Sequence, residues 1–320
     1  MGYLDNGVWH TGSPSFASGD GAFHRRASSF RSFVTADGSP GPTGEGGFRA
    51  EPGRYHLYVG YACPWAHRTM IMRELKGLTD QIGLSIVHHF MGDDGWTFEQ
   101  EAGTLPDTVN GATFMREVYV KADPAYTGRV TIPVLWDKSG GTIVSNESAE
   151  IIRMLNSAFD GVGAAPGDYY PVALREEIDA VNARVYDTLN NGVYKSGFAT
   201  KQTAYEAAVT ALFETLDWLE DKLAGKHYVV GDQLTEADIR LFTTLVRFDA
   251  VYHGHFKCNL RRIVDYPNLS GYLARLYAIE AFRETTNLDH IKKHYYRSHE
   301  SVNPTRIVPI GPAVPVPTAL

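Results

Sequence analysis

The sequence predicts a small α/β domain followed by an all-helical domain. A chain of 320 residues usually holds about two domains. The first half alternates short strand-like runs with helix-like runs, whereas long stretches with helical periodicity dominate beyond residue 171. Between the halves, 161–171 is rich in Gly and Pro, which is typical of a linker. These observations place a first domain at 54–160 and a second at 171–300.

The first domain is predicted to begin with a strand–helix–strand unit. Residues 55–60 and 83–90 have the composition of strands, and 64–76 has apolar positions at helical spacing. Such an order implies a right-handed crossover and a parallel strand pair. The polar, Gly-containing stretch 91–129 that follows is too long for an ordinary connection, so we expect a functional insertion. Trp96 lies within it.

A strand–strand–helix unit is predicted to complete this domain. Residues 130–137 are strand-like but contain Pro133, which normally argues against a strand. A cis bond between Ile132 and Pro133 at the strand entry would reconcile the two. A Gly-containing hairpin turn then leads to a partner strand at 142–145 and a helix at 149–157.

Four helices are predicted for the second domain, at about 172–194, 202–224, 236–252 and 268–281. Thr235 is a candidate N-cap for the third of them.

Both ends of the chain are predicted to be extended. The tail, 301–320, is rich in Pro. The arm, 1–53, is rich in Gly, Ser and Pro, but its aromatic residues suggest that it wraps on the protein, because disordered segments are usually poor in them. These residues are Phe16, Phe23, Phe30, Phe33 and Phe48.

Composition restricts the class of function. The formal net charge of −7 and the lack of a basic run argue against a nucleic-acid surface. Two cysteines, Cys63 and Cys258, are too few for a disulfide framework and fit a reducing compartment. We see no secretory signal in the first residues and no apolar run of about 18 residues that could span a membrane. We therefore expect a cytoplasmic protein.

The stretch Cys63-Pro64-Trp65-Ala66 carries the strongest functional signal. Pro64 suits the first helical position, which places Cys63 at a helix N-terminus. The unpaired N–H groups and the dipole there favour a thiolate and lower its pKa. A lone cysteine is more often a small buried hydrophobe, but this context favours a nucleophile. Ala66 stands where a Cys-x-x-Cys motif has its second cysteine, so an outside thiol would have to resolve a mixed disulfide.

With these elements in this order, the chain resembles the cytosolic glutathione transferases over roughly 54–295. The Cys-Pro-Trp-Ala motif, the insertion with Trp96 and the segments 190–199, 247–252 and 291–296 resemble the xi class, the glutathionyl-hydroquinone reductases. The resemblance implies a thioredoxin-like first domain, an all-helical substrate domain and a homodimer.

The resemblance also implies an activity. Cys63 would attack the sulfur of a glutathionyl-hydroquinone, and the hydroquinone would leave. A second glutathione would then release Cys63 and oxidised glutathione. Glutathione is a co-substrate in this scheme, and no permanently bound cofactor is implied.

Five residues match the positions that hold glutathione in the family. Ile132 would offer its backbone to the cysteinyl group, Glu147 would pair with the α-ammonium, and Ser148 would hold the γ-glutamyl carboxylate at a helix start. Trp96 and Arg129 match positions that contact the tripeptide. Without the resemblance, Glu147 and Ser148 fit a plain helix cap equally well, Trp96 fits a core residue and Arg129 a solvated charge.

Tyr194, Tyr252 and Tyr296 match the tyrosines that the family places around the aromatic substrate. A phenol can stabilise an oxygen substituent or donate a proton to the departing ring. Only the motif context distinguishes them among 18 tyrosines, and Tyr295 is an alternative to Tyr296. Cys258 lies outside the motifs and is expected to be peripheral.

His88 and His89 raise the question of a metal ion. Adjacent strand residues point to opposite faces of a sheet, so we expect the two rings to diverge and predict no metal.

Two alternative functions stay open on the sequence. One is an omega-like thioltransferase or dehydroascorbate reductase, which shares the Cys-Pro site. The other is a non-catalytic, glutathione-transferase-like binding module. The joint presence of Cys63, Glu147 and Ser148 argues against the second.

Overall fold

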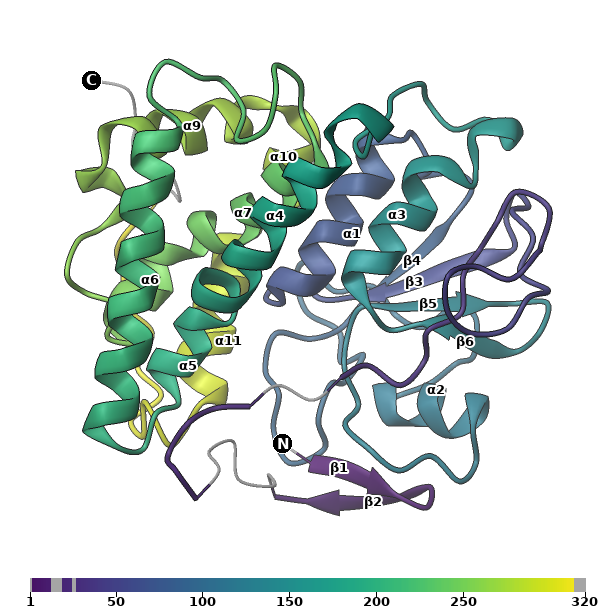
Figure 1. Cartoon of the computed structure of the whole chain (residues 1–320). Coiled ribbons are helices and arrows are strands. Elements are labelled where there is room, and N and C mark those ends of the chain that lie inside the picture. Colours follow the sequence, from purple (N-terminus) through teal and green to yellow (C-terminus); the bar gives the residue numbers. More distant parts are fainter. Residues whose placement is uncertain (1, 13–18, 25–26, 314–320) are drawn as a thin grey trace. The chain divides into compact units, whose positions relative to one another are not determined.

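The computed structural model describes residues 2–12, 19–24 and 27–313 (Figure 1). The chain divides into two compact units: Met1–Pro14 with Ala27–Asp168, and Ser15–Arg26 with Tyr169–Leu320. The arm is therefore shared: its short segment around Phe23 belongs to the helical unit, and the rest belongs to the α/β unit. Phe16, one of the aromatic residues expected to anchor the arm, lies outside the described residues.

A four-stranded mixed sheet forms the first unit, with strand order β4-β3-β5-β6. β3 pairs in parallel with β4 and antiparallel with β5, so the predicted strand–helix–strand unit is confirmed. Figure 1 shows α1 and α3 on one side of the sheet and α2 on the other. The elements are β3 Tyr55–Val59, α1 Pro64–Leu75, β4 Gly83–Ile86, α2 Met115–Ala122, β5 Val134–Asp137, β6 Thr142–Ser145 and α3 Ser148–Ser157.

One element of this unit was not predicted, and the end of one predicted strand is wrong. The insertion contains a helix, α2, which Glu117 stabilises by accepting hydrogen bonds from the two backbone N–H groups that precede the helix. The second strand ends at Ile86 rather than at residue 90. The backbone N–H of His88 instead donates to the carbonyl oxygen of Thr97, 2.8 Å away in the insertion.

The predicted cis bond between Ile132 and Pro133 is confirmed, and β5 begins at the next residue.

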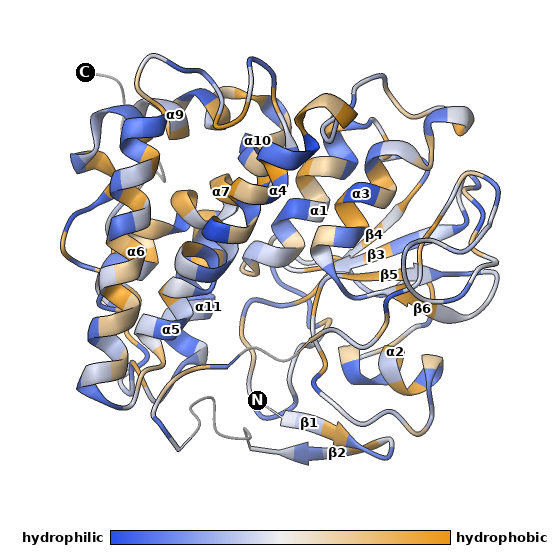
Figure 2. Ribbon diagram, in the orientation of Figure 1, coloured by the Kyte–Doolittle hydropathy of each residue, from blue (hydrophilic) through white to orange (hydrophobic). Residues whose placement is uncertain are grey.

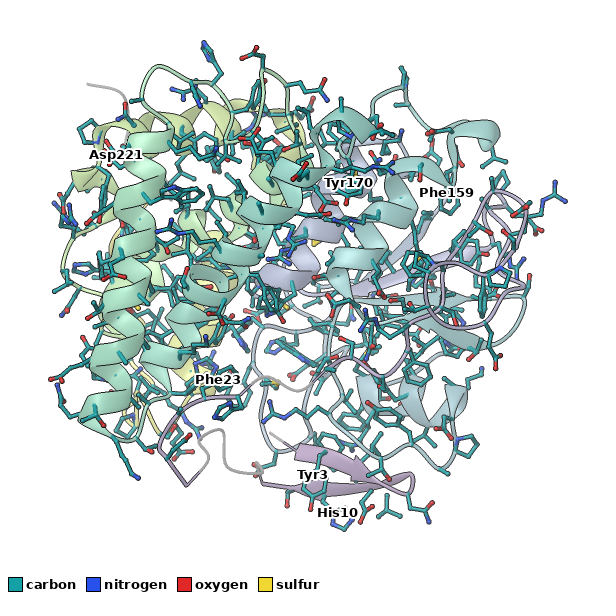
Figure 3. The ribbon with its side chains drawn as sticks, in the orientation of Figure 1. Tyr3, His10, Phe23, Phe159, Tyr170 and Asp221 are labelled. Carbon is teal, nitrogen blue, oxygen red and sulfur yellow. The ribbon has the colours of Figure 1, made fainter. Side chains whose placement is uncertain are left out.

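An N-terminal hairpin, which we did not predict, joins β1 (Gly2–Asp5) to β2 (Val8–Thr11). Asn6 and Gly7 form its turn, both with positive φ, and this pair of residues is typical of a type I′ turn. The rings of Tyr3 and His10 stack across the hairpin at 5.4 Å (Figure 3). The indole N–H of Trp9 donates to the carbonyl oxygen of Asp93 at 3.0 Å, which fixes the hairpin on the insertion.

Helices form the second unit. They are α4 Arg175–Val185, α5 Gly192–Gly197, α6 Gln202–Lys222, α7 Glu236–Arg247, α8 His253–His255, α9 Pro267–Ala278, α10 Glu280–Glu284 and α11 Leu288–Ser298. Figure 2 shows hydrophobic and hydrophilic positions alternating along α6, as expected for a helix with one buried face. Thr235 is the N-cap of α7, as predicted, and its N–H donates to the carboxylate of Asp238 at 2.8 Å.

The helix predicted at 172–194 is in fact interrupted. A π-helical turn, Tyr186–Asn190, separates α4 from α5, and a second one, Phe248–Tyr252, follows α7. The Asn190 side chain donates to the hydroxyl oxygen of Thr244 at 2.8 Å, which ties the first turn to α7. Such turns are rare and occur frequently at functional sites.

The C-terminal segment also differs from the sequence prediction, because α11 is an additional helix. Asn287 caps it by accepting the N–H of His290 at 3.0 Å. The tail contains no helix or strand as far as Ala313, and its remaining residues, 314–320, lie outside the described part. Within the described residues, no helix is both long and apolar enough to cross a membrane.

Candidate active site

Cys63 is the N-cap residue of α1, as the sequence predicts. Its backbone is extended, and its Sγ accepts the N–H of Ala66 at 3.5 Å. The thiol also lies 3.5 Å from the carbonyl oxygen of Ile132, to which it can donate. The Ala66 N–H and the helix dipole can stabilise a thiolate at this sulfur, whereas the contact with the Ile132 carbonyl is made by the protonated thiol. Cys63 is half-buried, whereas Cys258 is fully buried.

The local sequence explains why Cys63 and Ile132 meet. β3 is buried along its whole length and leads into Gly60. A Cβ atom on Gly60 would lie 2.9 Å from the Ile132 side chain and 2.8 Å from that of Val87, so only glycine fits there. Pro64 occupies the first turn of α1, where it fixes the start of the helix directly after the cysteine.

Glu147 and Ser148 lie at the start of α3. Glu147 is the N-cap, and its Oε1 accepts the N–H of Ala149 at 3.1 Å, so the interpretation of Glu147 as a helix cap is confirmed. Its Oε2 accepts the hydroxyl of Ser28, from the arm, at 2.9 Å. Ser148 is buried, and Arg68 of α1 donates to its hydroxyl oxygen at 3.4 Å. An anion at this helix start would meet backbone N–H groups and the positive end of the dipole.

Trp96 and Arg129 lie before and after α2. The carbonyl oxygen of Trp96 accepts the N–H of Met115 at 2.9 Å, and that of Arg129 accepts the hydroxyl of Tyr126 at 3.0 Å. The Trp96 side chain is almost entirely buried, as a core residue would be. These contacts fix the backbone of both residues, and their role toward glutathione stays a prediction.

Three tyrosines meet inside the helical unit: Tyr194 of α5, Tyr252 of the π-helical turn after α7, and Tyr295 of α11. The hydroxyl oxygen of Tyr295 lies 2.6 Å from that of Tyr194 and 3.0 Å from that of Tyr252. Tyr295 is therefore the middle member of a continuous hydrogen-bonded chain.

Tyr296 does not join Tyr194 and Tyr252 in the hydrogen-bonded chain, and its role toward the substrate stays a prediction. The hydroxyl of Tyr296 is 3.5 Å from the carbonyl oxygen of Ala250, and its ring packs against that of His255. Successive residues of a helix point about 100° apart, so only one of the two adjacent tyrosines can join the cluster, and it is Tyr295.

The protonation of the two inner phenols follows from their burial. Tyr252 and Tyr295 are at most 1% exposed, and burial raises the pKa of each well above its usual value. Both stay protonated at neutral pH and can donate hydrogen bonds. Tyr194 is half-buried and is the most accessible member of the chain.

His88 and His89 do not diverge as we expected. Both follow the end of β4, so the alternation of a strand does not apply to them, and their ring centres are 4.2 Å apart. His88 Nε2 and His89 Nδ1 lie 2.7 Å and 3.0 Å from one oxygen of Glu101. His88 Nδ1 accepts the N–H of Phe90 at 3.1 Å, so the proton of the neutral ring is on Nε2, the atom that a metal would need unprotonated. The absence of a metal stays a prediction.

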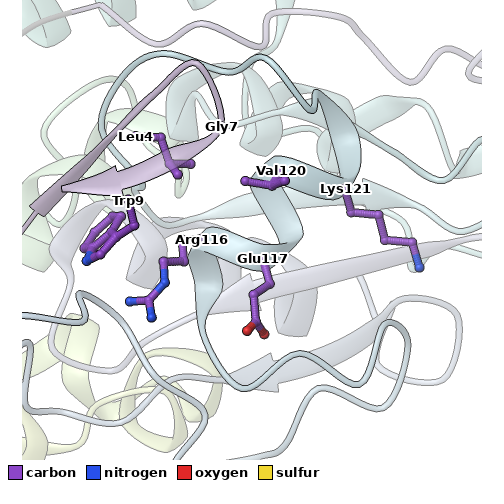
Figure 4. A pocket seen from close by; sticks show the side chains of 7 residues that line it. All are labelled: Leu4, Gly7, Trp9, Arg116, Glu117, Val120 and Lys121. Atoms are coloured by element: carbon purple, nitrogen blue, oxygen red, sulfur yellow. The ribbon is translucent and has the colours of Figure 1, made fainter.

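A cavity of about 370 Å³ lies between the N-terminal hairpin and α2 (Figure 4). Its lining includes Trp9, Arg116 and Val120 and none of the predicted site residues. The Arg116 guanidinium already donates to Asp94 at 3.0 Å and lies over the Trp9 ring. The cavity is therefore separate from the chemistry predicted for Cys63.

Ser28, which bonds to Glu147, was not predicted, because it comes from the arm, where no local pattern marks a residue as facing a site. Tyr295 was predicted only as an alternative to Tyr296.

The α/β sheet with a Cys-Pro pair at the start of α1, the cis-proline before β5 and the helical second unit together define a glutathione transferase. Family models agree: residues 62–158 match the glutathione S-transferase N-terminal domain, and residues 202–275 match its C-terminal domain.

Individual relatives identify the class more closely. Over 317 residues, 99% of this chain and 98% of the relative, the chain is 60% identical to the glutathionyl-hydroquinone reductase PcpF of Sphingobium chlorophenolicum. It is also similar to the glutathione-bound structure of YqjG, a glutathione transferase homologue from Escherichia coli K-12, with a TM-score of 0.90, 56% identity and coverage of 97% and 96% of the two chains.

A third relative is the Xi glutathione S-transferase structure from Phanerochaete chrysosporium, with a TM-score of 0.87, 54% identity and coverage of 92% of this chain and 99% of that one. The chain belongs to the Xi class of glutathione transferases, which confirms the resemblance noted in the sequence.

Proposed function

We propose that this protein is a glutathionyl-hydroquinone reductase. The observation that carries the proposal is Cys63, held as the N-cap of α1 with Ala66 in place of a second cysteine, in a chain 60% identical to a reductase of that name. A thiolate at such a position is a nucleophile that needs an external thiol to regenerate it.

The reaction has two displacement steps. The Cys63 thiolate attacks the sulfur of the glutathionyl thioether, and a Cys63–glutathione disulfide forms. The carbon–sulfur bond breaks with its electron pair on the ring carbon, which takes up a proton, and the hydroquinone leaves. The thiolate of a second glutathione then attacks the glutathione sulfur of the mixed disulfide, which releases oxidised glutathione and the Cys63 thiolate. The proton lost by that second glutathione balances the one taken up by the ring.

Glutathione is held by the α/β unit. The backbone of Ile132, which already contacts the Cys63 thiol, pairs with the cysteinyl group of glutathione. Ser148 and the first N–H groups of α3 take the γ-glutamyl carboxylate. Glu147 pairs with the α-ammonium, and Trp96 and Arg129 contact the rest of the tripeptide.

The proton for the ring carbon comes from the tyrosine chain. Tyr194 is its accessible end, and Tyr295 and Tyr252 are the buried hydrogen-bond partners behind it. A positioned acid of this kind typically contributes about 10²–10⁴-fold to a rate.

A coupled assay tests the proposal. The protein is given glutathionyl-menadiol and excess glutathione, and free menadiol and oxidised glutathione are followed together. Equal release of both products, lost in Cys63→Ala, supports the proposal. Full turnover by Cys63→Ala, or no turnover by the unmodified protein, defeats it.

Two outcomes identify the alternatives. Turnover of dehydroascorbate or of small glutathione disulfides without turnover of glutathionyl-menadiol would indicate an omega-like thioltransferase. Binding of glutathione without any turnover would indicate a binding module. Neither outcome is expected, because Cys63 and the tyrosine chain are both in place.

The assembly and the compartment belong to the same proposal. The protein acts as a homodimer in the cytoplasm, where glutathione is abundant and both cysteines stay reduced; in the structure both are free thiols. Light scattering that shows a monomer at working concentration would reject the dimer.

A further inference from the structure

One segment of the arm, residues 19–24, packs on the helical unit at the junction of α5 and α6. The carbonyl oxygen of Gly21 accepts the N–H of Thr200 at 3.1 Å, and that of Gly19 accepts the ammonium of Lys201 at 2.8 Å. Gly21 has a φ of +84°, and a Cβ there would lie 2.6 Å from the Lys201 side chain, so glycine is required for this approach.

Phe23 is the side chain that this segment buries. It is 5% exposed, whereas the side chains of Asp20 and His24 on either side of it are 63% and 68% exposed. Asp20 also accepts the N–H of Ala22 at 2.9 Å, which shapes the turn that aims Phe23 at the helices. Figure 3 shows Phe23 beside α5.

Phe23 packs directly on the tyrosine chain. Its ring centre lies 6.2 Å from that of Tyr194, with 29° between the planes, and 5.8 Å from that of Phe198. These are favourable distances for aromatic packing. Tyr252 and Tyr295 are buried inside the helical unit, whereas Tyr194 is half-buried. Phe198 and Phe256 of the same unit also pack on the Tyr194 ring, and Phe23 adds a contact from the arm.

We propose that Phe23 is a positioning residue for the reductase reaction. By packing on the Tyr194 ring, it keeps the Tyr194 hydroxyl hydrogen-bonded to Tyr295, in the position from which Tyr194 donates a proton to the ring carbon of the substrate. The inference rests on the proposed function and extends it to the arm. The arm segment then acts through Tyr194 and does not contact the reacting atoms.

The proposal separates two reactions of the same active site. Cleavage of a glutathionyl-hydroquinone needs a proton on carbon, whereas exchange of glutathione with a small disulfide at Cys63 needs none. Loss of Phe23 should therefore impair the first reaction and leave the second intact. A general loss of folding or of glutathione binding would impair both.

The test compares Phe23→Ala and Phe23→Leu with the unmodified protein in the two assays. For glutathionyl-menadiol, Phe23→Ala is expected to lower kcat about tenfold to a hundredfold, within the usual effect of a positioned acid, with KM for glutathione unchanged. Exchange with hydroxyethyl disulfide is expected to stay within about twofold. Phe23→Leu keeps an apolar side chain against Tyr194 and is expected to restore most of the kcat.

Phe33→Ala is the matched control, because among the described residues of the arm Phe33 is the other phenylalanine that is less than a tenth exposed, and it belongs to the α/β unit. It is expected to lower stability and to leave the ratio of the two activities unchanged.

Three results would overturn the proposal. The first is an unchanged kcat in Phe23→Ala, and the second is a parallel fall of both activities. The third is the finding that the unmodified protein exchanges glutathione with small disulfides but does not cleave glutathionyl-menadiol. This result would defeat the proposed function as well as the inference.

Discussion

The hydroxyl oxygens of Tyr194 and Tyr295 lie 2.6 Å apart, although 101 positions separate the two residues in the chain. α5 and α11 therefore place two phenols in one short hydrogen bond, and Tyr252 extends it to a chain of three. Burial raises the pKa of the two inner phenols, so Tyr252 and Tyr295 stay protonated at neutral pH and can donate hydrogen bonds. In the proposed reaction Tyr194 gives up its proton, and a hydrogen bond from Tyr295 would stabilise the phenolate that forms.

Replacement of Tyr295 tests this arrangement most directly. Tyr295→Phe removes the middle hydroxyl and leaves the ring in place, so kcat for glutathionyl-menadiol should fall about tenfold or more, as expected when a positioned acid loses its partner. Tyr296→Phe is the matched control, because the adjacent phenol lies outside the chain, and its kcat should stay within about twofold. Steady-state assays with excess glutathione measure both. Equal effects of the two substitutions would contradict the assignment of Tyr295.

The two cysteines should differ sharply in reactivity. Cys258 is fully buried, and burial raises the pKa of its thiol to about 12, so almost none of it is thiolate at neutral pH. Cys63 is half-buried and accepts a backbone N–H. Iodoacetamide at pH 7 should label one thiol per chain, and peptide mass spectrometry should locate the label on Cys63. In Cys63→Ser the label should be lost, whereas Cys258→Ala should still take it up. Rapid labelling of Cys258 in the native protein would contradict the structure.

How far the sequence predicts this structure depends on the kind of signal. The α/β unit was predictable because Cys63-Pro64 and Ile132-Pro133 mark a helix start and a strand entry directly. The N-terminal hairpin has an Asn6-Gly7 turn that is a strong local signal, and it was overlooked because the surrounding segment is rich in Gly, Ser and Pro.

The remaining differences had no local signal. A π-helical turn keeps the chain helical and only shifts the apolar pattern by about one residue, so the sequence predicted one continuous helix across Tyr186–Asn190. Adjacent tyrosines on α11 differ only in direction, and that direction depends on how the helices pack. The hydrogen bond between Ser28 and Glu147 joins residues 119 positions apart. The residues next to Ser28 in the sequence form no motif that would indicate this contact.

Ser28 provides a test of the glutathione site. Its hydroxyl donates to the Glu147 oxygen that does not cap α3, so it limits the rotation of that carboxylate. Ser28→Ala should raise KM for glutathione a few-fold and leave kcat unchanged, because the Glu147 carboxylate loses one of the hydrogen bonds that orient it. Ser29→Ala is the control, because Ser29 bonds instead to the hydroxyl of Tyr126. A Ser28→Ala enzyme with normal KM would argue against Glu147 as the partner of the ammonium.

Acidification should destabilise the protein through histidines that are buried in the neutral form. Burial lowers the pKa of His56 and His255 to about 4 and that of His299 well below its usual value. Between pH 6.5 and about 4 the unfolded chain takes up protons at these sites and the folded chain does not, so the free energy of unfolding falls as the pH falls. A histidine shifted this far contributes roughly 3 kcal/mol over that range.

His56→Gln isolates the contribution of one site. Glutamine cannot titrate but can donate to the Ser85 hydroxyl, as His56 Nε2 does at 2.8 Å. Burial also raises the pKa of Asp238 and Asp249, so the folded protein binds protons at these two residues as the pH falls. This raises the free energy of unfolding and opposes the effect of the histidines, so His56→Gln must be compared with the unmodified protein. Urea unfolding at pH 7.0, 5.5 and 4.5 should show a smaller loss of stability in His56→Gln than in the unmodified protein. Parallel losses in the two proteins would mean that His56 is already protonated in the folded state.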